Sequence, residues 1–217
     1  MAYEAAIFDL DGTILNTLDD LATSVNHALA QHHMPQVSTD AVRRFTGNGI
    51  ATLVARCVPE GTSEQEVQAT LETFKAHYAK HSQDTTGPYP GIIDMLHELD
   101  ENDVACAVVS NKADFAVQHL VRTCFPSMFG AVVGEQPLIR RKPDPDMVWA
   151  AITELGVEDP DNVVYLGDSE VDIETARNTG CDCVLVSWGF RDVPWLERHG
   201  AKKIVDTPQE LLEAILA

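Results

Sequence analysis

Two carboxylates, Asp9 and Asp11, directly follow a short apolar run at residues 3–8. The run has the composition of a buried strand, so both acids would lie at the carboxyl end of that strand. Burying one carboxylate is costly, and burying two without a cation is costlier. The pair therefore indicates a bound metal ion, a role in chemistry, or both.

Other reactive side chains also follow apolar runs or precede predicted helices. They are Ser110 and Asn111 after residues 104–109, Lys142 before Pro143, and Asp168 and Asp172 after residues 163–166. Because the carboxyl ends of parallel strands lie side by side, one pocket would hold acids, a hydroxyl group and an ammonium group.

This set of groups is suited to phosphoryl transfer, which needs a cation, donors for the phosphate oxygens and an in-line nucleophile. Mg²⁺ takes oxygen ligands and keeps several waters, so two carboxylates and a backbone carbonyl are enough protein. We expect Asp9 to attack phosphorus and form an aspartyl-phosphate. Asp11 would protonate the leaving oxygen and later deprotonate the attacking water. Ser110, Asn111 and Lys142 would stabilise the developing oxygen charge.

The elements that would position these groups alternate between strand and helix patterns from residue 87 onward. Predicted strands after the first cover residues 104–109, 131–133, 163–166, 184–186 and 204–205, with helical patterns between them. Such alternation predicts an α/β fold with a parallel sheet covered on both faces. Right-handed crossovers make it a doubly wound parallel sheet, that is, a Rossmann-like core.

A helical block separates the first strand from the others. Between residues 18 and 80, apolar residues such as Leu21, Val25 and Leu29 recur at helical spacing. We interpret the block as an inserted α-helical cap domain at residues 17–83, and residues 1–16 and 84–217 as the hydrolase core. A cap would exclude bulk water while an ester is cleaved.

The composition excludes some partners. The 217 residues include 34 acidic residues and 15 Lys plus Arg, a formal net charge of -19. This field repels nucleic-acid backbones and anionic lipid, so neither is expected as a partner. The five cysteines are odd in number and scattered, which favours free thiols and a cytoplasmic location. No segment has the length of a membrane span or the pattern of a signal peptide, and the sequence carries no signal of oligomeric state.

Four segments together resemble a known family. In order, residues 9–13 (Asp-Leu-Asp-Gly-Thr), Ser110-Asn111, Lys142-Pro143 and residues 167–172 are similar to the four motifs of the haloacid dehalogenase-like hydrolases. Residues 46–49 and 187–191 are also similar to its phosphoglycolate phosphatase branch, which has a helical cap. The resemblance covers essentially the whole chain.

The resemblance implies a role for each motif residue. Asp9 would be the nucleophile and a Mg²⁺ ligand, and Asp11 the general acid/base that also offers its backbone carbonyl to the metal. Asp168 would complete the protein ligands, with Asp172 binding through water or orienting Lys142. Ser110, Asn111 and Lys142 would bind the phosphate. The implied substrate is a small phosphorylated metabolite, with phosphoglycolate favoured.

Several alternatives stay open at this point. A β-phosphoglucomutase-like phosphomutase would share all four motifs and the cap, and an inorganic pyrophosphatase of similar build is a second alternative. A signalling receiver domain also uses an acidic Mg²⁺ pocket, but its phosphorylated aspartate does not end the first strand. Taken alone, Ser110-Asn111 would indicate only a helix N-cap, and Lys142 before proline would indicate a solvated lysine.

Overall fold

The computed structural model describes residues 3–217, and the chain divides into two compact units. Met1–Leu15 and Pro88–Ala217 form an α/β unit, and Asn16–Gly87 form an inserted helical unit. The chain enters the insert through β2 (Leu15–Asn16) and leaves it through β3 (Gly87–Pro88). These two short strands pair with each other, so the entry and the exit of the insert are joined.

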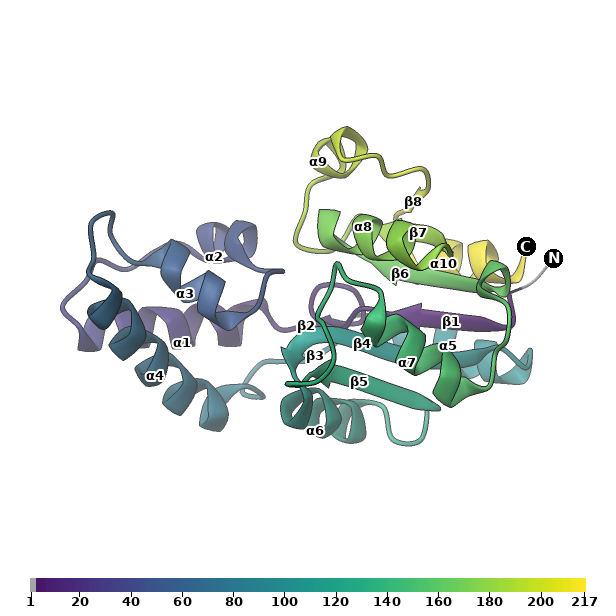
Figure 1. The fold of residues 1–217 in the computed structure, drawn as a ribbon, viewed down its shortest axis with the longest axis horizontal. Helices are drawn as coiled ribbons and strands as arrows, with labels where there is room; N and C mark the ends of the chain where they lie inside the picture. Colours follow the sequence, from purple (N-terminus) through teal and green to yellow (C-terminus); the bar gives the residue numbers. More distant parts are fainter. Residues whose placement is uncertain (1–2) are drawn as a thin grey trace. The chain divides into compact units, whose positions relative to one another are not determined.

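A six-stranded parallel sheet forms the centre of the α/β unit, in the order β5-β4-β1-β6-β7-β8 (Figure 1). The strands are β1 (Ala5–Phe8), β4 (Ala105–Ala113), β5 (Ala131–Glu135), β6 (Val163–Gly167), β7 (Asp182–Val186) and β8 (Ile204–Val205). In register, Ala5 of β1 lies beside Ala105 of β4 and Val163 of β6. The strand order therefore reverses around β1, which is where α/β sheets bind their ligands.

Helices cover both faces of this sheet because successive side chains of β1 point to opposite sides. Ala6 and Phe8 pack in a core with α5 (Ile92–Glu101), α6 (Asp114–Cys124) and α10 (Pro208–Leu216). Ala5 and Ile7 pack in a second core with α7 (Asp146–Leu155) and α8 (Glu170–Thr179). A 3₁₀ helix (Pro160–Asn162) and α9 (Val193–Arg198) complete the unit. The predicted doubly wound α/β fold is confirmed.

One strand is longer than the sequence predicts. The pattern predicts a strand at residues 104–109, but β4 continues to Ala113 and pairs there with Glu135 after an irregularity in register. Ser110 and Asn111 therefore lie within β4 and not after it. Ala113 occupies the N-cap position of α6, without a side-chain cap bond, so the N-cap interpretation of Ser110-Asn111 is wrong.

The inserted unit contains α1 (Leu18–Gln31), α2 (Thr39–Phe45), α3 (Ile50–Cys57) and α4 (Glu64–His81). Its own apolar core includes Leu21, Val25 and Leu29 of α1, which are the residues that recur at helical spacing in the sequence. Ser63 and Glu66 form a capping box that begins α4. The insert thus has its own core and its own helix signals.

The two ends of the insert are tied by a buried carboxylate. Asp20 of α1 accepts hydrogen bonds from the backbone N–H groups of Thr85 (3.0 Å) and Thr86 (2.9 Å), and from the Thr85 hydroxyl (2.6 Å). Burial alone would raise the pKa of Asp20, but these donors outweigh burial and lower it. The negative charge of Asp20 is thus stabilised by neutral hydrogen-bond donors.

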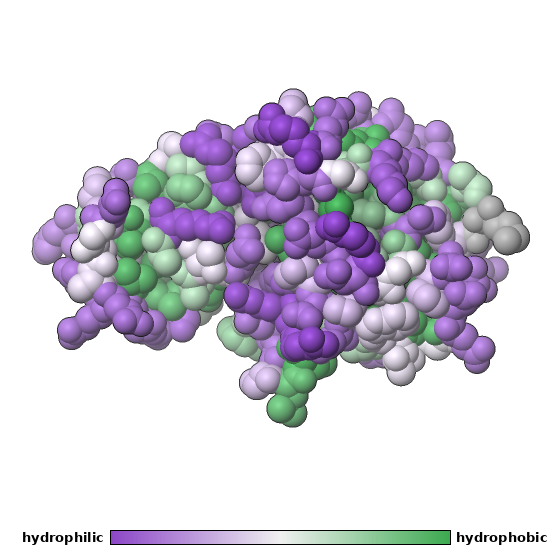
Figure 2. Space-filling view, turned by 45° about the horizontal axis from the view of Figure 1, so that its top comes forward, coloured by the Kyte–Doolittle hydropathy of each residue, from purple (hydrophilic) through white to green (hydrophobic). Residues whose placement is uncertain are grey.

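Polar side chains cover most of the face shown in Figure 2. Large apolar side chains that are exposed, such as Phe115 and Leu138, are few among the residues the structure describes. None of the helices within residues 3–217 is long and apolar enough to span a lipid bilayer.

Candidate active site

Asp9 occupies the position directly after β1, at the carboxyl edge of the sheet. Its backbone N–H donates to the carbonyl of Leu166 in β6 (2.8 Å), which continues the parallel ladder by one residue. The residue is 9 % exposed. The carboxylate is therefore fixed where the strand order reverses, and little of it is exposed.

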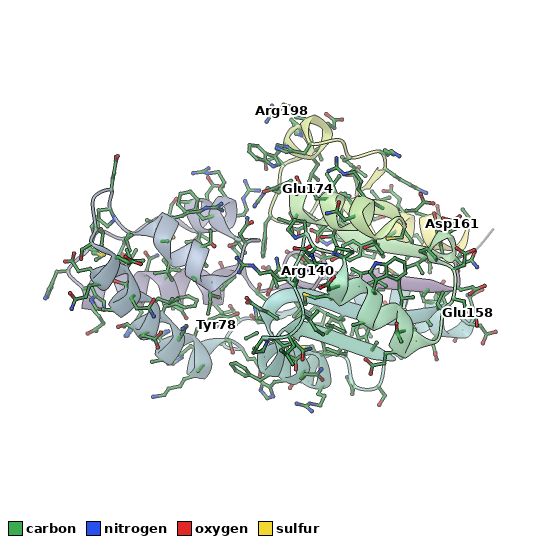
Figure 3. All side chains as sticks on the ribbon, in the orientation of Figure 1. Tyr78, Arg140, Glu158, Asp161, Glu174 and Arg198 are labelled. Atoms are coloured by element: carbon green, nitrogen blue, oxygen red, sulfur yellow. The ribbon has the colours of Figure 1, made fainter. Side chains whose placement is uncertain are left out.

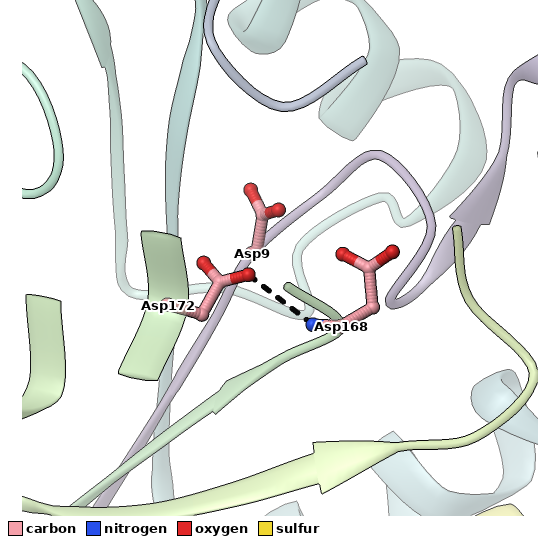
Figure 4. Close-up of side chains that lie close together, drawn as sticks. All are labelled: Asp9, Asp168 and Asp172. Carbon is pink, nitrogen blue, oxygen red and sulfur yellow. Dashed lines mark hydrogen bonds between the residues drawn. The ribbon is translucent and has the colours of Figure 1, made fainter. Parts of the chain in front are cut away.

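Three carboxylates meet at this edge (Figure 4). Asp9, Asp168 and Asp172 each offer an oxygen within 4.8 Å of the others'. Burial raises the pKa of Asp9 to about 7, and neighbouring acids add to the rise. Burial, followed by Asp172 and Asp9, raises the pKa of Asp168 well above its usual value. A bound divalent cation would reverse both effects, so the acid cluster is suited to one.

Asp172 differs from the other two acids because both of its oxygens are already engaged. Oδ2 accepts from the Ser169 hydroxyl (2.6 Å) and from the backbone N–H groups of Ser169 (3.0 Å) and Asp168 (3.2 Å). Oδ1 accepts from Lys142 (2.8 Å) and Tyr165 (3.3 Å). These contacts, which include the capping box of α8, favour the orienting role of Asp172 over direct binding of a metal.

Lys142 is buried, with its ammonium group between two acids. Nζ lies 2.9 Å from Oδ1 of Asp9 and 2.8 Å from Oδ1 of Asp172, and it donates to the Tyr165 hydroxyl at 2.9 Å. Burial alone would lower the pKa of Lys142, but Asp172 and Asp9 outweigh burial and raise it. The solvated-lysine interpretation is therefore wrong for this residue.

The neighbouring Arg140, labelled in Figure 3, has the surface role that Lys142 lacks. Its guanidinium pairs with Asp144 (2.8 Å) and Asp146 (2.7 Å), and its side chain is 67 % exposed. Of Arg140 and Lys142, only the lysine reaches the acids at the edge of the sheet.

Asp11 pairs with a lysine that the motif analysis did not single out. Nζ of Lys112 lies 2.7 Å from Oδ1 and 2.9 Å from Oδ2 of Asp11, and Lys112 is buried in β4. The apolar run that predicts this strand ends at residue 109, and the register of β4 is irregular between Val109 and Ala113. Simple strand alternation therefore does not predict that Lys112 reaches Asp11.

The other two predicted phosphate-binding residues lie beside these groups in β4. Ser110 is buried, and its hydroxyl accepts from the backbone N–H of Lys112 (3.3 Å). The Asn111 amide donates to the backbone carbonyl of Lys142 (3.1 Å). Asn111 therefore joins the Lys142 segment to β4, a contact that positions the lysine.

Two glycines allow the backbone to approach Asp168 closely. Gly12 has a φ of +91°, and a Cβ there would lie 2.5 Å from Oδ2 of Asp168. A Cβ on Gly189 would also collide with the Asp168 side chain. The next residue, Phe190, donates its backbone N–H to Oδ2 of Asp168. This donor has no side-chain signature, so residue types alone could not reveal it.

The segment around Gly189 is further attached to the site loops. The indole of Trp188 donates to the carbonyl of Thr13 (3.1 Å), and Arg191 pairs with Glu170 at the start of α8 (2.8 Å). Residues 187–191, singled out only through the resemblance, thus hold Asp168 and the loop after β1.

Comparisons with known proteins agree with this geometry. A model of the haloacid dehalogenase-like hydrolase family matches residues 6–186. A phosphoglycolate phosphatase from Haemophilus influenzae is 34% identical over 88% of this chain and 89% of its own. An N-acetylmuramic acid 6-phosphate phosphatase from Pseudomonas aeruginosa is 30% identical over 99% of this chain and 96% of its own. A crystal structure from Lactobacillus delbrueckii, provisionally named a phosphoglycolate phosphatase, is 44% identical, with a TM-score of 0.96 over 100% of both chains.

The chain belongs to the haloacid dehalogenase-like hydrolases. The predicted resemblance to the phosphoglycolate phosphatase branch of that family is confirmed by these relatives, as is the prediction of a phosphoric monoester hydrolase.

Proposed function

We propose that the chain is a Mg²⁺-dependent phosphatase that hydrolyses a small phosphomonoester, favouring phosphoglycolate, through an aspartyl-phosphate on Asp9. The observation that carries the proposal is the placement of Asp9. Its carboxylate ends the central strand between the ammonium of Lys142, 2.9 Å away, and the acid Asp168. A nucleophile, a cation and an acidic site for a divalent ion at one edge are what phosphoryl transfer requires.

Asp9, the backbone carbonyl of Asp11 and Asp168 would hold the metal ion. When bound, Mg²⁺ would offset the charge of the acids and of the phosphate. Asp172 is not assigned this role, because both of its oxygens already accept hydrogen bonds.

The remaining steps belong to side chains of the chain. An oxygen of Asp9 attacks phosphorus and the ester oxygen leaves with a proton from Asp11. Asp11 then takes a proton from the water that attacks the aspartyl-phosphate, which releases inorganic phosphate and restores Asp9. Lys142 and the Ser110 hydroxyl stabilise the charge on the phosphate oxygens, and Asp172 holds the lysine in place.

We further propose that residues 17–83 act as a cap domain which excludes bulk water and contributes to the choice of substrate. Its connection by two paired strands, β2 and β3, supports a hinge at the junction. The five cysteines are free thiols, which supports a cytoplasmic location.

The substrate is tested by a panel of phosphate esters in Mg²⁺, with phosphate release and product identity both measured. The panel contains phosphoglycolate, N-acetylmuramic acid 6-phosphate, β-glucose 1-phosphate and pyrophosphate. We expect phosphoglycolate to give the highest kcat/KM. Conversion of glucose 1-phosphate to its 6-isomer without net phosphate release would instead identify a phosphomutase.

The mechanism is tested by Asp9→Asn, which keeps the size of the side chain and removes the nucleophile. We expect kcat to fall by about 10³-fold or more. Asp94→Asn, which changes an exposed acid of α5, is the matched control. Wild-type turnover by Asp9→Asn on the best ester would overturn the assignment.

A further inference from the structure

A second cavity of the α/β unit lies at the amino ends of β7 and β8. It has a volume of about 460 Å³, within the range of roughly 300–1,000 Å³ that small-molecule sites occupy. Its walls are formed by residues of α8, of β7 and of the segment 199–203, which leads into β8. The three elements α8, β7 and β8 are labelled in Figure 1. Among the described residues that line it, none belongs to the acid and lysine cluster of the candidate active site.

The floor of this cavity is apolar. The apolar residues that line it include the buried Ile173 and Ala176 of α8 and Leu185 of β7, together with the half-buried Cys181 and Cys183. Burial raises the pKa of Cys181 to about 12 and that of Cys183 further. Both thiols are therefore neutral near pH 7, and the floor offers an uncharged surface of the kind that packs against a ring.

The rim is cationic. Arg177, Lys202 and Lys203 line the cavity and are exposed, and within residues 3–217 no ion pair engages any of the three. One acid, Asp182, lines the cavity as well, and its carboxylate accepts a hydrogen bond from Tyr3 (2.8 Å). Three cations thus face one carboxylate in a chain that carries 15 Lys plus Arg and 34 acids.

The local excess of cations favours the binding of an anionic ligand in this cavity. The net charge of -19 repels anions from the surface in general, so an anion would bind only where cations cluster. The guanidinium group of arginine and the ammonium group of lysine are the usual partners of phosphate. An apolar floor beside a cationic rim fits a ligand that has a ring at one end and a phosphate at the other.

We propose that this cavity is a binding site for a mononucleotide-sized organic phosphate, separate from the candidate active site. The phosphate lies on Arg177, Lys202 and Lys203, and the ring packs on the floor between α8 and β7. Binding at this site does not require the phosphatase chemistry, so the site can be tested independently of the proposed function.

The test is a titration of the full-length protein with adenosine 5′-monophosphate, followed by two-dimensional ¹H–¹⁵N NMR. We expect saturable shifts of the amides at residues 181–183 and 200–203. The double variant Lys202→Gln/Lys203→Gln is expected to raise the Kd by about tenfold or more, since each tenfold step is about 1.4 kcal/mol. Lys80→Gln, a change of an exposed lysine in α4, should leave the Kd unchanged.

Adenosine and inorganic phosphate, titrated separately, test the two halves of the site. Both should bind more weakly than the nucleotide if ring and phosphate each contribute. Phosphate that binds as tightly as the nucleotide would overturn the role of the floor, and adenosine that does so would overturn the role of the rim. Shifts confined to residues around Asp9, or an unchanged Kd in the double variant, would remove the site altogether.

Discussion

Each of the two units buries an acid, and the two acids respond to burial in opposite directions. In the inserted unit, hydrogen bonds from Thr85 and Thr86 lower the pKa of Asp20. In the α/β unit, burial raises the pKa of Asp9 to about 7 although Lys142 lies 2.9 Å away. The two acids thus differ in whether the fold compensates their charge.

This difference is the one expected between a structural acid and an acid with the catalytic role proposed for Asp9. The partners of Asp20 are neutral donors within the same unit, so its charge is satisfied without a ligand. Asp9 shares one ammonium with Asp172 and stands near a third acid, Asp168. An acid cluster with too few cations is expensive to keep, and such clusters concentrate at functional sites.

The largest effect is expected from Lys142→Met, which keeps the length of the side chain and removes the charge that the two acids share. Asp9 and Asp172 would both lose their cation. We expect the free energy of unfolding to fall by about 3–5 kcal/mol, and kcat/KM on the best ester to fall by about 10³-fold. Urea denaturation and steady-state kinetics measure the two effects.

Arg140→Met is the matched control for this change, two positions earlier in the chain. Its ion pairs are exposed, so a loss of no more than about 1 kcal/mol is expected. Equal effects of the two variants on stability would show that Lys142 is not the buried counter-charge of the site.

A smaller effect is expected from Mg²⁺ itself, measured by thermal unfolding during a titration. A ligand that binds only the folded state at a concentration of 100 times its Kd stabilises it by about 2.7 kcal/mol. We expect Asp168→Asn to remove most of this gain, and Asp20→Asn to keep it, because Asp20 belongs to the insert. A Mg²⁺ response that survives Asp168→Asn undiminished would contradict the proposed ligand set.

The sequence was sufficient to predict which side chains converge in the α/β unit. Asp9, Lys142 and Asp168 follow or adjoin buried apolar runs, and parallel strands bring such positions to one edge. The resemblance to a family added their roles. In the structure, Nζ of Lys142 lies 2.9 Å from Oδ1 of Asp9, and Asp168 offers an oxygen within 4.8 Å of one of Asp9.

Other contacts could not be predicted, for physical reasons. Lys112 reaches Asp11 because β4 continues past an irregular register to Ala113, and the apolar pattern ends four residues earlier. The N–H of Phe190 that binds Asp168 is a backbone group, which any residue type would supply. Contacts of these kinds depend on tertiary register and not on local composition.

The smallest effect that sharpens the comparison is expected from Asp20→Asn. The amide cannot accept from Thr85 and Thr86 with both of its terminal atoms, so one partly buried donor loses its partner. We expect a loss of about 1–3 kcal/mol in the free energy of unfolding at pH 7. Urea denaturation at several pH values measures this loss.

The pH dependence of this loss identifies its cause. The pKa of Asp20 is lower in the folded state than the usual value of about 3.9. The carboxylate therefore stabilises the fold fully above that value, and the contribution disappears as the pH falls through the folded-state pKa. The difference in the free energy of unfolding between wild type and Asp20→Asn should accordingly be constant from pH 7 to 5 and shrink below pH 4. Asp19→Asn, a change of the exposed neighbour, is the matched control and should keep the wild-type stability at pH 7. A loss for Asp20→Asn that does not shrink in acid would mean that the charge of Asp20 is not what joins the ends of the insert.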